Sequence, residues 1–341
     1  MGRGPTEKYH QQLHPLFEKG SLTCLSERAI KGLIQNESPL ILNIEPTNDC
    51  NLRCDYCPGE KARAIFGTHT LNPDDLPEIL GPSPWLPENL IWTNFHKDGE
   101  PLINPGLVRM IKHIKNFYPH SDTHLNTNGL LLTPSRGLAL LDAGLDDLTI
   151  SVDAAWSESY TKRKGLSSAS PVLGIMEENV RAFFLNRTSM HSTVARVKMI
   201  EFADTTPKEI EDFYKKWHNV ADQVQITGAH DWSGGVEEKI TDFTKPARHA
   251  CPLLWYMLAI NADKTVSICN VDWNRTGVLG DLNANISLHN IWQGDRLKEI
   301  RRLHLYGYFD SPRMPEICKD CVVWAGAANL DAFLKEKTSM L

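Results

Sequence analysis

Three cysteines, Cys50, Cys54 and Cys57, lie within eight residues of one another as a C-x3-C-x2-C triplet. Three thiolates this close in sequence can converge on one metal centre. A closed structural zinc site requires four ligands, and so does an iron–sulfur cluster held by protein alone. Between residues 15 and 68 the one other cysteine or histidine is Cys24. A thioredoxin-like C-x-x-C motif would leave Cys50 without a role. The triplet therefore favours a cubane cluster with one iron left open to a ligand other than protein.

The triplet resembles the signature of the radical S-adenosylmethionine (radical SAM) superfamily, in which an aromatic residue, here Tyr56, precedes the third cysteine. The resemblance implies a [4Fe–4S] cluster whose open iron is chelated by the amino and carboxylate groups of SAM. An electron passed into the sulfonium would then release a 5′-deoxyadenosyl radical. The implied electron donor is a protein of the flavodoxin or ferredoxin type.

A second motif is expected to bind the amino group of SAM. Residues 96–101 read His-Lys-Asp-Gly-Glu-Pro and resemble the G-G-E-P motif of the same superfamily. An ammonium group requires carboxylate and carbonyl acceptors, and a glycine allows the backbone to approach closely. Gly99, Glu100 and Pro101 match this motif, whereas Asp98 replaces its first glycine.

Polar residues at the ends of two later strands are candidates for the SAM ribose. Asn126 ends one expected strand, and Ser151 and Asp153 end the next. Family members use such positions to bind the ribose hydroxyls, for which Ser151 and Asp153 are suited as hydrogen-bond partners. The adjacent Asn128-Gly129 pair is more typical of a simple turn than of a ligand.

Two cations on the fifth expected strand, Arg196 and Lys198, are candidate catalytic residues. We expect one of them to meet the SAM carboxylate or the substrate; a solvated position is the alternative for the other. Gly228 and His230 could border adenine or substrate, although a lone histidine is more often structural. Cys24 is a candidate hydrogen-atom donor of the kind that radical SAM epimerases use, with a buried, unreactive thiol as its default role.

Four further cysteines form a C-x17-C pair followed at a distance by a C-x2-C pair: Cys251, Cys269, Cys318 and Cys321. They resemble the shortened SPASM-type auxiliary-cluster domain called Twitch, and residues 279–282 and 287–292 match the helix-entry pattern of that domain. This resemblance implies one auxiliary [4Fe–4S] cluster with four thiolate ligands and no open iron. A four-cysteine zinc ribbon is the alternative.

Strand and helix patterns alternate from residue 40 onward. Strands are expected at 40–44, 90–95, 123–126, 147–152, 193–200 and 223–227. Helices are expected at 105–117, 138–143, 172–184 and 207–217. This order predicts a parallel β/α architecture, with the active site built by loops that follow the carboxyl ends of the strands. The family resemblance implies an α/β fold, a partial (β/α)6 TIM-like barrel.

The pattern changes after residue 230. Strands at 256–260 and 265–268 predict a β-hairpin framed by two cysteines, and a helix at 288–303 leads to the last cysteine pair. We therefore expect three regions, listed here with their bounds: an N-terminal extension with short helical patterns at 7–19 and 26–35 (1–38), the barrel (39–235) and a small C-terminal α+β Twitch domain (236–341).

Composition is that of an ordinary soluble globular protein, with 41% hydrophobic and 23% charged residues among 341. The net charge of −6 gives no reason to expect a nucleic-acid partner. No apolar run approaches the length of a membrane span. Seven of the eight cysteines fall into two sets, which is typical of metal chemistry in a reducing compartment. We expect a cytoplasmic protein.

The resemblance covers nearly the whole chain after residue 38 and extends to 2-deoxy-scyllo-inosamine dehydrogenase and related sugar and aminocyclitol enzymes of antibiotic biosynthesis. It implies an oxidoreductase-type radical SAM enzyme that takes a hydrogen atom from a carbon bearing a hydroxyl group. Loss of the hydroxyl proton and of a second electron to the auxiliary cluster would leave a ketone.

Four alternatives stay open at this stage. Epimerisation shares the first step but ends with a hydrogen donor, and decarboxylation or dehydration of a similar substrate shares the scaffold. Ribosomal-peptide maturation is the third; many such enzymes carry a peptide-binding domain ahead of the barrel, for which 38 residues are too few, so a small-molecule substrate is favoured. The fourth is a zinc-stabilised binding module.

Overall fold

The computed structural model describes residues 38–322 except 82–85, 87–89, 168–170, 230, 238–247 and 249. The helices expected at 7–19 and 26–35, together with Cys24 and His230, lie outside the described residues.

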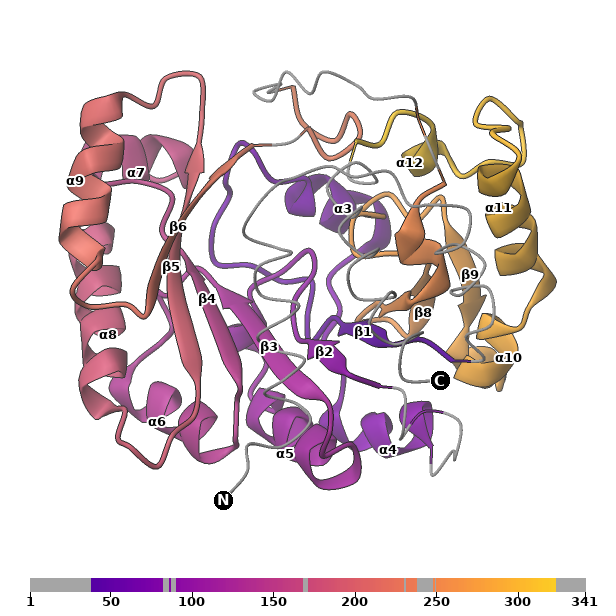
Figure 1. Ribbon diagram of the computed structural model, residues 1–341, viewed down its shortest axis with the longest axis horizontal. Coiled ribbons are helices and arrows are strands. Elements are labelled where there is room, and N and C mark those ends of the chain that lie inside the picture. The colour runs from indigo at the N-terminus through magenta and orange to yellow at the C-terminus, as the bar shows by residue number, and fades with distance from the viewer. Residues whose placement is uncertain are drawn as a thin grey trace, which may run out of the picture.

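A nine-stranded sheet runs through the described part of the chain in the order β6-β5-β4-β3-β2-β1-β7-β8-β9 (Figure 1). Its first six strands in sequence are β1 (Ile41–Ile44), β2 (Trp92–Asn94), β3 (Asp122–Thr127), β4 (Asp147–Ser151), β5 (Val194–Glu201) and β6 (Gln223–Gly228). Each is parallel to its neighbours. The six predicted strands and their parallel arrangement are confirmed, and the fold is a partial TIM-like barrel.

Helices cover the outer side of these strands (Figure 1). They are α3 (Gly59–Phe66), α4 (Leu76–Leu80), α5 (Leu107–Phe117), α6 (Pro134–Asp142), α7 (Ser157–Arg163), α8 (Val172–Asn186) and α9 (Pro207–Trp217). The expected i, i+3, i+4, i+7 pattern of α5 is buried in full, at Leu107, Met110, Ile111 and Ile114. The Thr206 hydroxyl accepts a hydrogen bond from the Glu209 N–H and so caps α9. All four predicted helices are confirmed, whereas α3, α4 and α7 were not predicted.

The inner face of the parallel sheet is polar. Side chains alternate between the two faces of a strand, and in β5 the fully buried Ala195, Val197 and Met199 point toward the helices. Arg196 and Lys198 therefore share the inner face. A polar inner face next to the carboxyl ends of the strands suits a ligand site better than a packed core.

The C-terminal strands continue the same sheet. β7 (Met257–Ile260) pairs in parallel with β1, and β8 (Thr265–Ser267) pairs antiparallel with β7. This confirms the predicted hairpin, while β9 (Val278–Asp281) was not predicted. The boundaries proposed for the three regions stay a prediction. No helix in the described residues is long and apolar enough to cross a membrane.

The single helix predicted at 288–303 is wrong. The structure has two helices there, α10 (Leu288–Trp292) and α11 (Asp295–Leu305), and α12 (Glu316–Lys319) follows. The helix is interrupted at Gly294, whose backbone is extended with φ −69° and ψ 154°. Extended backbone at one residue ends the i→i−4 hydrogen-bond ladder, although the apolar pattern continues through it.

Candidate active site

A cleft of about 330 Å³ opens at the carboxyl ends of β1 to β6. It is lined by ten of the residues predicted to bind or border metal, SAM or substrate: Cys50, Cys54, Cys57, Gly99, Glu100, Asn126, Ser151, Asp153, Lys198 and Gly228. Pro101 and Arg196 do not line it. Loops separated by more than a hundred positions thus contribute to one site, as the parallel sheet predicts.

The cysteine triplet lies in the loop after β1. The Cys50 N–H donates to Asp49 Oδ1 at 2.8 Å, and the Gly59 N–H donates to Cys57 Sγ at 3.4 Å. Burial raises the pKa of all three thiols, that of Cys57 to about 12. The thiols are therefore protonated in the metal-free protein, and metal binding must release their protons.

Close packing explains why the turn after β2 needs a glycine at one position only. A Cβ on Gly99 would lie 2.3 Å from the Thr47 carbonyl oxygen and 2.5 Å from that of Asp49. The neighbouring Glu100 N–H donates to the same Asp49 oxygen at 2.7 Å. Asp98 has room because its side chain turns away to form an ion pair with Lys97. The replacement of the first glycine of G-G-E-P by Asp98 therefore does not prevent the turn from packing against the cysteine loop.

Glu100 links the ends of β2 and β3. Its carboxylate accepts hydrogen bonds from the Thr127 hydroxyl at 2.7 Å and from the Leu102 and Asn128 N–H groups at 3.0 and 2.8 Å. Burial raises the pKa of Glu100, and these donors oppose the rise. Two carboxylate oxygens can accept about four hydrogen bonds, so one further donor can be accommodated. Pro101 is buried behind this group, in the short helix η2 (Pro101–Ile103).

The aromatic residue of the cysteine triplet is held by a buried ion pair. Lys164 Nζ lies 2.6 Å from Asp153 Oδ2 and 2.8 Å from Tyr56 Oη, and the Tyr56 hydroxyl donates to the same carboxylate at 2.8 Å. Burial alone would raise the pKa of Asp153, but the charges of Lys164 and Lys198 and the hydrogen bonds from Lys164 and Tyr56 together outweigh it, and the pKa is lowered. Lys164 lines the cleft, but no motif around it in the sequence marks it as a candidate site residue.

Asp153 also carries backbone strain. It has φ 65°, in the left-handed region that is uncommon for non-glycine residues. Its Oδ1 accepts from the Ile200 N–H at 3.0 Å. The Ser151 hydroxyl donates to Asn126 Oδ1 at 3.0 Å. The predicted ribose ligands are therefore adjacent, but the Asp153 carboxylate already has protein partners on both oxygens.

The two cations on β5 have different roles. Arg196 forms a two-pronged pair with Asp147, with both N···O distances at 2.6 Å, and also bonds to Thr149 and Gln223. Its position gives no support to a role in SAM or substrate binding. Lys198 lines the cleft. The register of β4 against β5 accounts for this difference, because it places Asp147 within reach of Arg196.

Two histidines and an asparagine belong to the site region but were not predicted. His96 lines the cleft, and its ring lies edge-on to that of His124 with a centroid distance of 5.0 Å. Asn270, next to Cys269, also lines the cleft. The loop of the second cysteine set therefore borders the cleft of the first.

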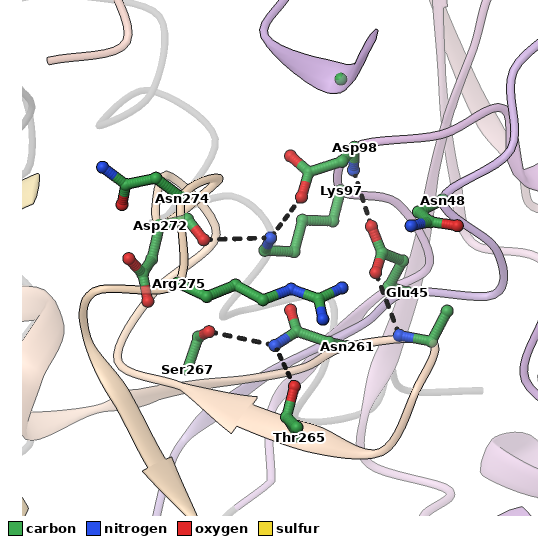
Figure 2. Close-up of polar contacts among 12 residues, drawn as sticks. Glu45, Asn48, Lys97, Asp98, Asn261, Thr265, Ser267, Asp272, Asn274 and Arg275 are labelled. Atoms are coloured by element: carbon green, nitrogen blue, oxygen red, sulfur yellow. Dashed lines mark hydrogen bonds and ion pairs between the residues drawn. The ribbon is translucent and has the colours of Figure 1, made fainter. Parts of the chain in front are cut away.

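Buried polar contacts join the two cysteine regions (Figure 2). Glu45, which is fully buried, accepts from the Asp98 N–H and the Ala262 N–H, both at 3.0 Å. Lys97 pairs with Asp98 and donates to the Asp272 carbonyl oxygen at 3.3 Å. The turn that precedes Gly99 is thus tied to the hairpin turn and to the loop that follows Cys269.

The second cysteine set surrounds a small pocket of mainly apolar residues. All four cysteines line it, together with Leu253, Leu254, Ile268, Val271, Ile317, Arg248 and His304. Burial, followed by the charges of neighbouring cysteines, raises the pKa of Cys251 to about 12 and that of Cys318 well above its usual range. Arg248 donates to the carbonyl oxygens of Cys318 and Lys319. These contacts pin the C-x2-C turn in place.

Comparison with protein families matches both halves of this arrangement. The profile of the radical SAM superfamily matches residues 44–194, and that of the SPASM iron–sulfur cluster-binding domain matches residues 251–322. The chain carries a radical SAM domain followed by a SPASM domain.

Curated relatives of the radical SAM domain include GTP 3′,8-cyclases. The protein of Alkaliphilus metalliredigens is 32% identical over 174 residues, which cover 50% of each chain. The protein of Limosilactobacillus fermentum is 27% identical over 186 residues, 52% of this chain and 51% of the relative. The chain thus spans about half the length of the curated relatives it matches.

Solved structures with the same fold include SuiB and BtrN. SuiB of Streptococcus suis bound to the precursor peptide SuiA has a TM-score of 0.61 at 13% identity, covering 92% of this chain and 82% of that one. BtrN in complex with AdoMet and 2-DOIA has a TM-score of 0.53 at 16% identity, covering 83% and 92%. Structural similarity at such low sequence identity shows only that the fold is shared.

A radical SAM domain and a SPASM domain together imply SAM and two iron–sulfur clusters, and the residues present fit these groups. The three thiols of the radical SAM domain open onto a polar cleft, as a cluster with one exchangeable iron ligand requires. The four thiols of the SPASM domain share one apolar pocket. In the described residues, no three histidine, cysteine or carboxylate side chains converge on a single ion. A cubane needs no such convergence, because each thiolate binds a different iron.

Proposed function

We propose that this chain is a radical SAM enzyme that takes a hydrogen atom from a hydroxylated small molecule such as a sugar, aminocyclitol or nucleoside, and that it oxidises an alcohol carbon in secondary metabolism. The observation that carries the proposal is the shared cleft. It is lined by the cysteine triplet, by the turn at Gly99 and Glu100, and by Asn270 beside the second cysteine set. A substrate in this cleft would lie between the two cluster sites.

SAM and the cluster held by Cys50, Cys54 and Cys57 would supply the radical that removes the hydrogen atom. Oxidation of a secondary alcohol to a ketone removes one hydrogen atom, one proton and one further electron. The electron needs an acceptor, and a cluster held by the four cysteines of the SPASM domain would provide one beside the cleft. The role of the protein is to fix one C–H bond in place and to exclude water.

The lining of the cleft supports a polar substrate, because lysines, carboxylates and amides border it. Epimerisation, decarboxylation, dehydration and peptide maturation use the same scaffold and are outcomes of the test below. A flavodoxin- or ferredoxin-type electron donor and a cytoplasmic location belong to the same proposal.

Cyclisation of a purine nucleotide is a second candidate. The curated relatives of the radical SAM domain are GTP 3′,8-cyclases. The second cysteine set favours oxidation over cyclisation if its cluster accepts an electron.

Product analysis tests both candidates. The enzyme is reconstituted anaerobically with iron, sulfide and SAM, reduced with dithionite, and incubated with aminocyclitols, amino sugars, nucleosides and GTP. We expect 5′-deoxyadenosine together with a product lighter by two hydrogen atoms. An isomeric nucleotide would favour cyclisation, and a product whose mass changes only by solvent deuterium uptake would favour epimerisation. Absence of reductive 5′-deoxyadenosine formation under every condition would overturn the assignment as a radical SAM enzyme.

A further inference from the structure

Two of the three lysines that line the cleft form ion pairs. Lys97 pairs with Asp98, and Lys164 pairs with Asp153. Lys198 lines the same cleft, and no hydrogen bond or ion pair joins its ammonium group to any residue in the described part of the chain. The carboxylate that acts on Lys198 is that of Asp153, which already forms an ion pair with Lys164. Two ammonium groups therefore share one carboxylate, and a negatively charged ligand would supply the second counter-charge.

A second polar group without a partner faces the same region. The Nδ1 atom of His96 is buried and has no hydrogen-bond partner in the described residues. Burial, followed by the charges of His124 and Lys198, lowers the pKa of His96 well below its usual range. Burial is the main cause, so the imidazole of His96 is neutral at this end of the cleft.

We propose that Lys198 and His96 form a subsite for an acidic group of the substrate, a carboxylate or a phosphate ester. The inference rests on the function proposed above and narrows it to substrates that carry a negative charge. In this subsite the ammonium of Lys198 supplies the counter-charge, and the imidazole of His96 supplies a neutral hydrogen-bonding group.

The carboxylate of SAM has the same chemistry, but the structure favours the substrate as the source. Lys164 is the cation that acts most strongly on the Cys54 thiol, and it also acts on Glu100. Lys198 is not among the main influences on either group. It lies on β5, which β4 and β3 separate from β2 and its SAM-type turn. Lys198 is therefore placed away from the groups expected to hold the amino-acid part of SAM.

The test compares ligands that differ mainly in charge. Affinities of the reconstituted, SAM-loaded holoenzyme are measured by anaerobic calorimetry for inorganic phosphate, for glucosamine and glucosamine 6-phosphate, and for guanosine and GTP. Wild type is compared with Lys198→Met and with Ile200→Met, a control on the same strand that also lines the cleft. His96→Phe keeps an aromatic ring beside His124 and removes the ring nitrogens.

We expect at least one acidic ligand to bind about tenfold or more tightly than its neutral partner, because a hydrogen bond to a charged group is worth more than a neutral one. Lys198→Met should abolish this preference, His96→Phe should reduce it, and Ile200→Met should retain it. The affinity for SAM should stay within about twofold in all three variants.

Two results would overturn the subsite. One is equal binding of acidic and neutral ligands by wild type, with no binding of phosphate; the other is a loss of SAM affinity in Lys198→Met as large as the loss of acidic-ligand affinity. Failure of the proposed function shows differently, as absence of 5′-deoxyadenosine from an enzyme that still prefers the acidic ligand. If Lys198→Met does not fold, His96→Phe carries the test alone, and an unchanged preference in that variant counts against the proposal.

Discussion

The two cysteine sites of this protein differ in what surrounds their thiols. The triplet of the radical SAM domain opens onto a cleft lined by lysines, carboxylates and amides. The four cysteines of the SPASM domain share a small pocket with leucine, isoleucine and valine side chains. Burial raises the pKa of one thiol in each site, Cys57 and Cys251, to about 12. The clearest difference between the sites is therefore in access and polarity.

This difference separates two kinds of task. An iron that must bind SAM needs a polar, open space in front of it, with hydrogen-bond partners already oriented, as Glu100 and Asn126 are. A cluster that only passes electrons needs four protein ligands and a shell that excludes water. The Glu45 and Lys97 contacts hold the two sites in a fixed relation, since they tie the SAM-type turn to the loop after Cys269.

Removing the triplet should have the largest effect. In Cys50→Ala/Cys54→Ala/Cys57→Ala we expect iron to fall from about eight to about four atoms per chain, because only the four-cysteine site remains. All reductive cleavage of SAM should be lost with the open iron. Iron analysis and chromatography of 5′-deoxyadenosine check this expectation. Cleavage above a no-enzyme control would contradict the role given to the triplet, and a wild-type chain with four irons and one zinc would contradict the second cluster.

Removing half of the second site should separate two activities. A folded Cys318→Ala/Cys321→Ala variant should still form 5′-deoxyadenosine, because the triplet and the cleft are intact. It should lose most oxidised product, because the second electron has no acceptor.

The ratio of product to 5′-deoxyadenosine is the measurement for this variant. If both fall together, the second site is structural or binds substrate. If both survive, the reaction is redox-neutral, and Cys24 becomes the first candidate for the hydrogen donor.

Most of the features compared above could be predicted from local patterns in the sequence. Spacing alone identified the cysteines of both sites, and the alternation of strand and helix predicted the parallel sheet that brings Gly99 and Ser151 to one edge. Spacing does not show which polar side chains pair across that edge. Lys164 lies 108 positions after Tyr56 and reaches its hydroxyl only through the fold. Likewise, Arg196 and Lys198 are equivalent in the sequence, and only the register of β4 against β5 gives Arg196 a partner in Asp147.

The buried pair beneath the triplet should contribute strongly to stability. Lys164→Met leaves the Asp153 carboxylate buried without its ammonium partner, and breaking such a pair costs about 3–5 kcal/mol. The loop that carries Tyr56 should loosen as well, so we expect less iron at the triplet and full occupancy of the second site. The matched control is Lys162→Met, which removes an exposed pair with Asp204 and should change little. Thermal unfolding and iron analysis check the result; equal midpoints for the two variants would contradict it.

The smallest effect should come from a carboxyl group remote from both sites. Burial, followed by the charges of Asp146 and Asp147, raises the pKa of Asp122 to about 7. An unfolded aspartate titrates near pH 4, so between about pH 4 and 7 the folded protein holds a proton that the unfolded chain has lost. Stability from this group is therefore greatest below pH 4 and falls as the pH rises to about 7. Asp122→Asn should remove this dependence and raise the thermal midpoint at pH 8 by a few degrees. Both cysteine sites should keep their iron, and 5′-deoxyadenosine formation should not change. A midpoint at pH 8 equal to or below that of wild type would show that the Asp122 carboxyl is not destabilising when ionised.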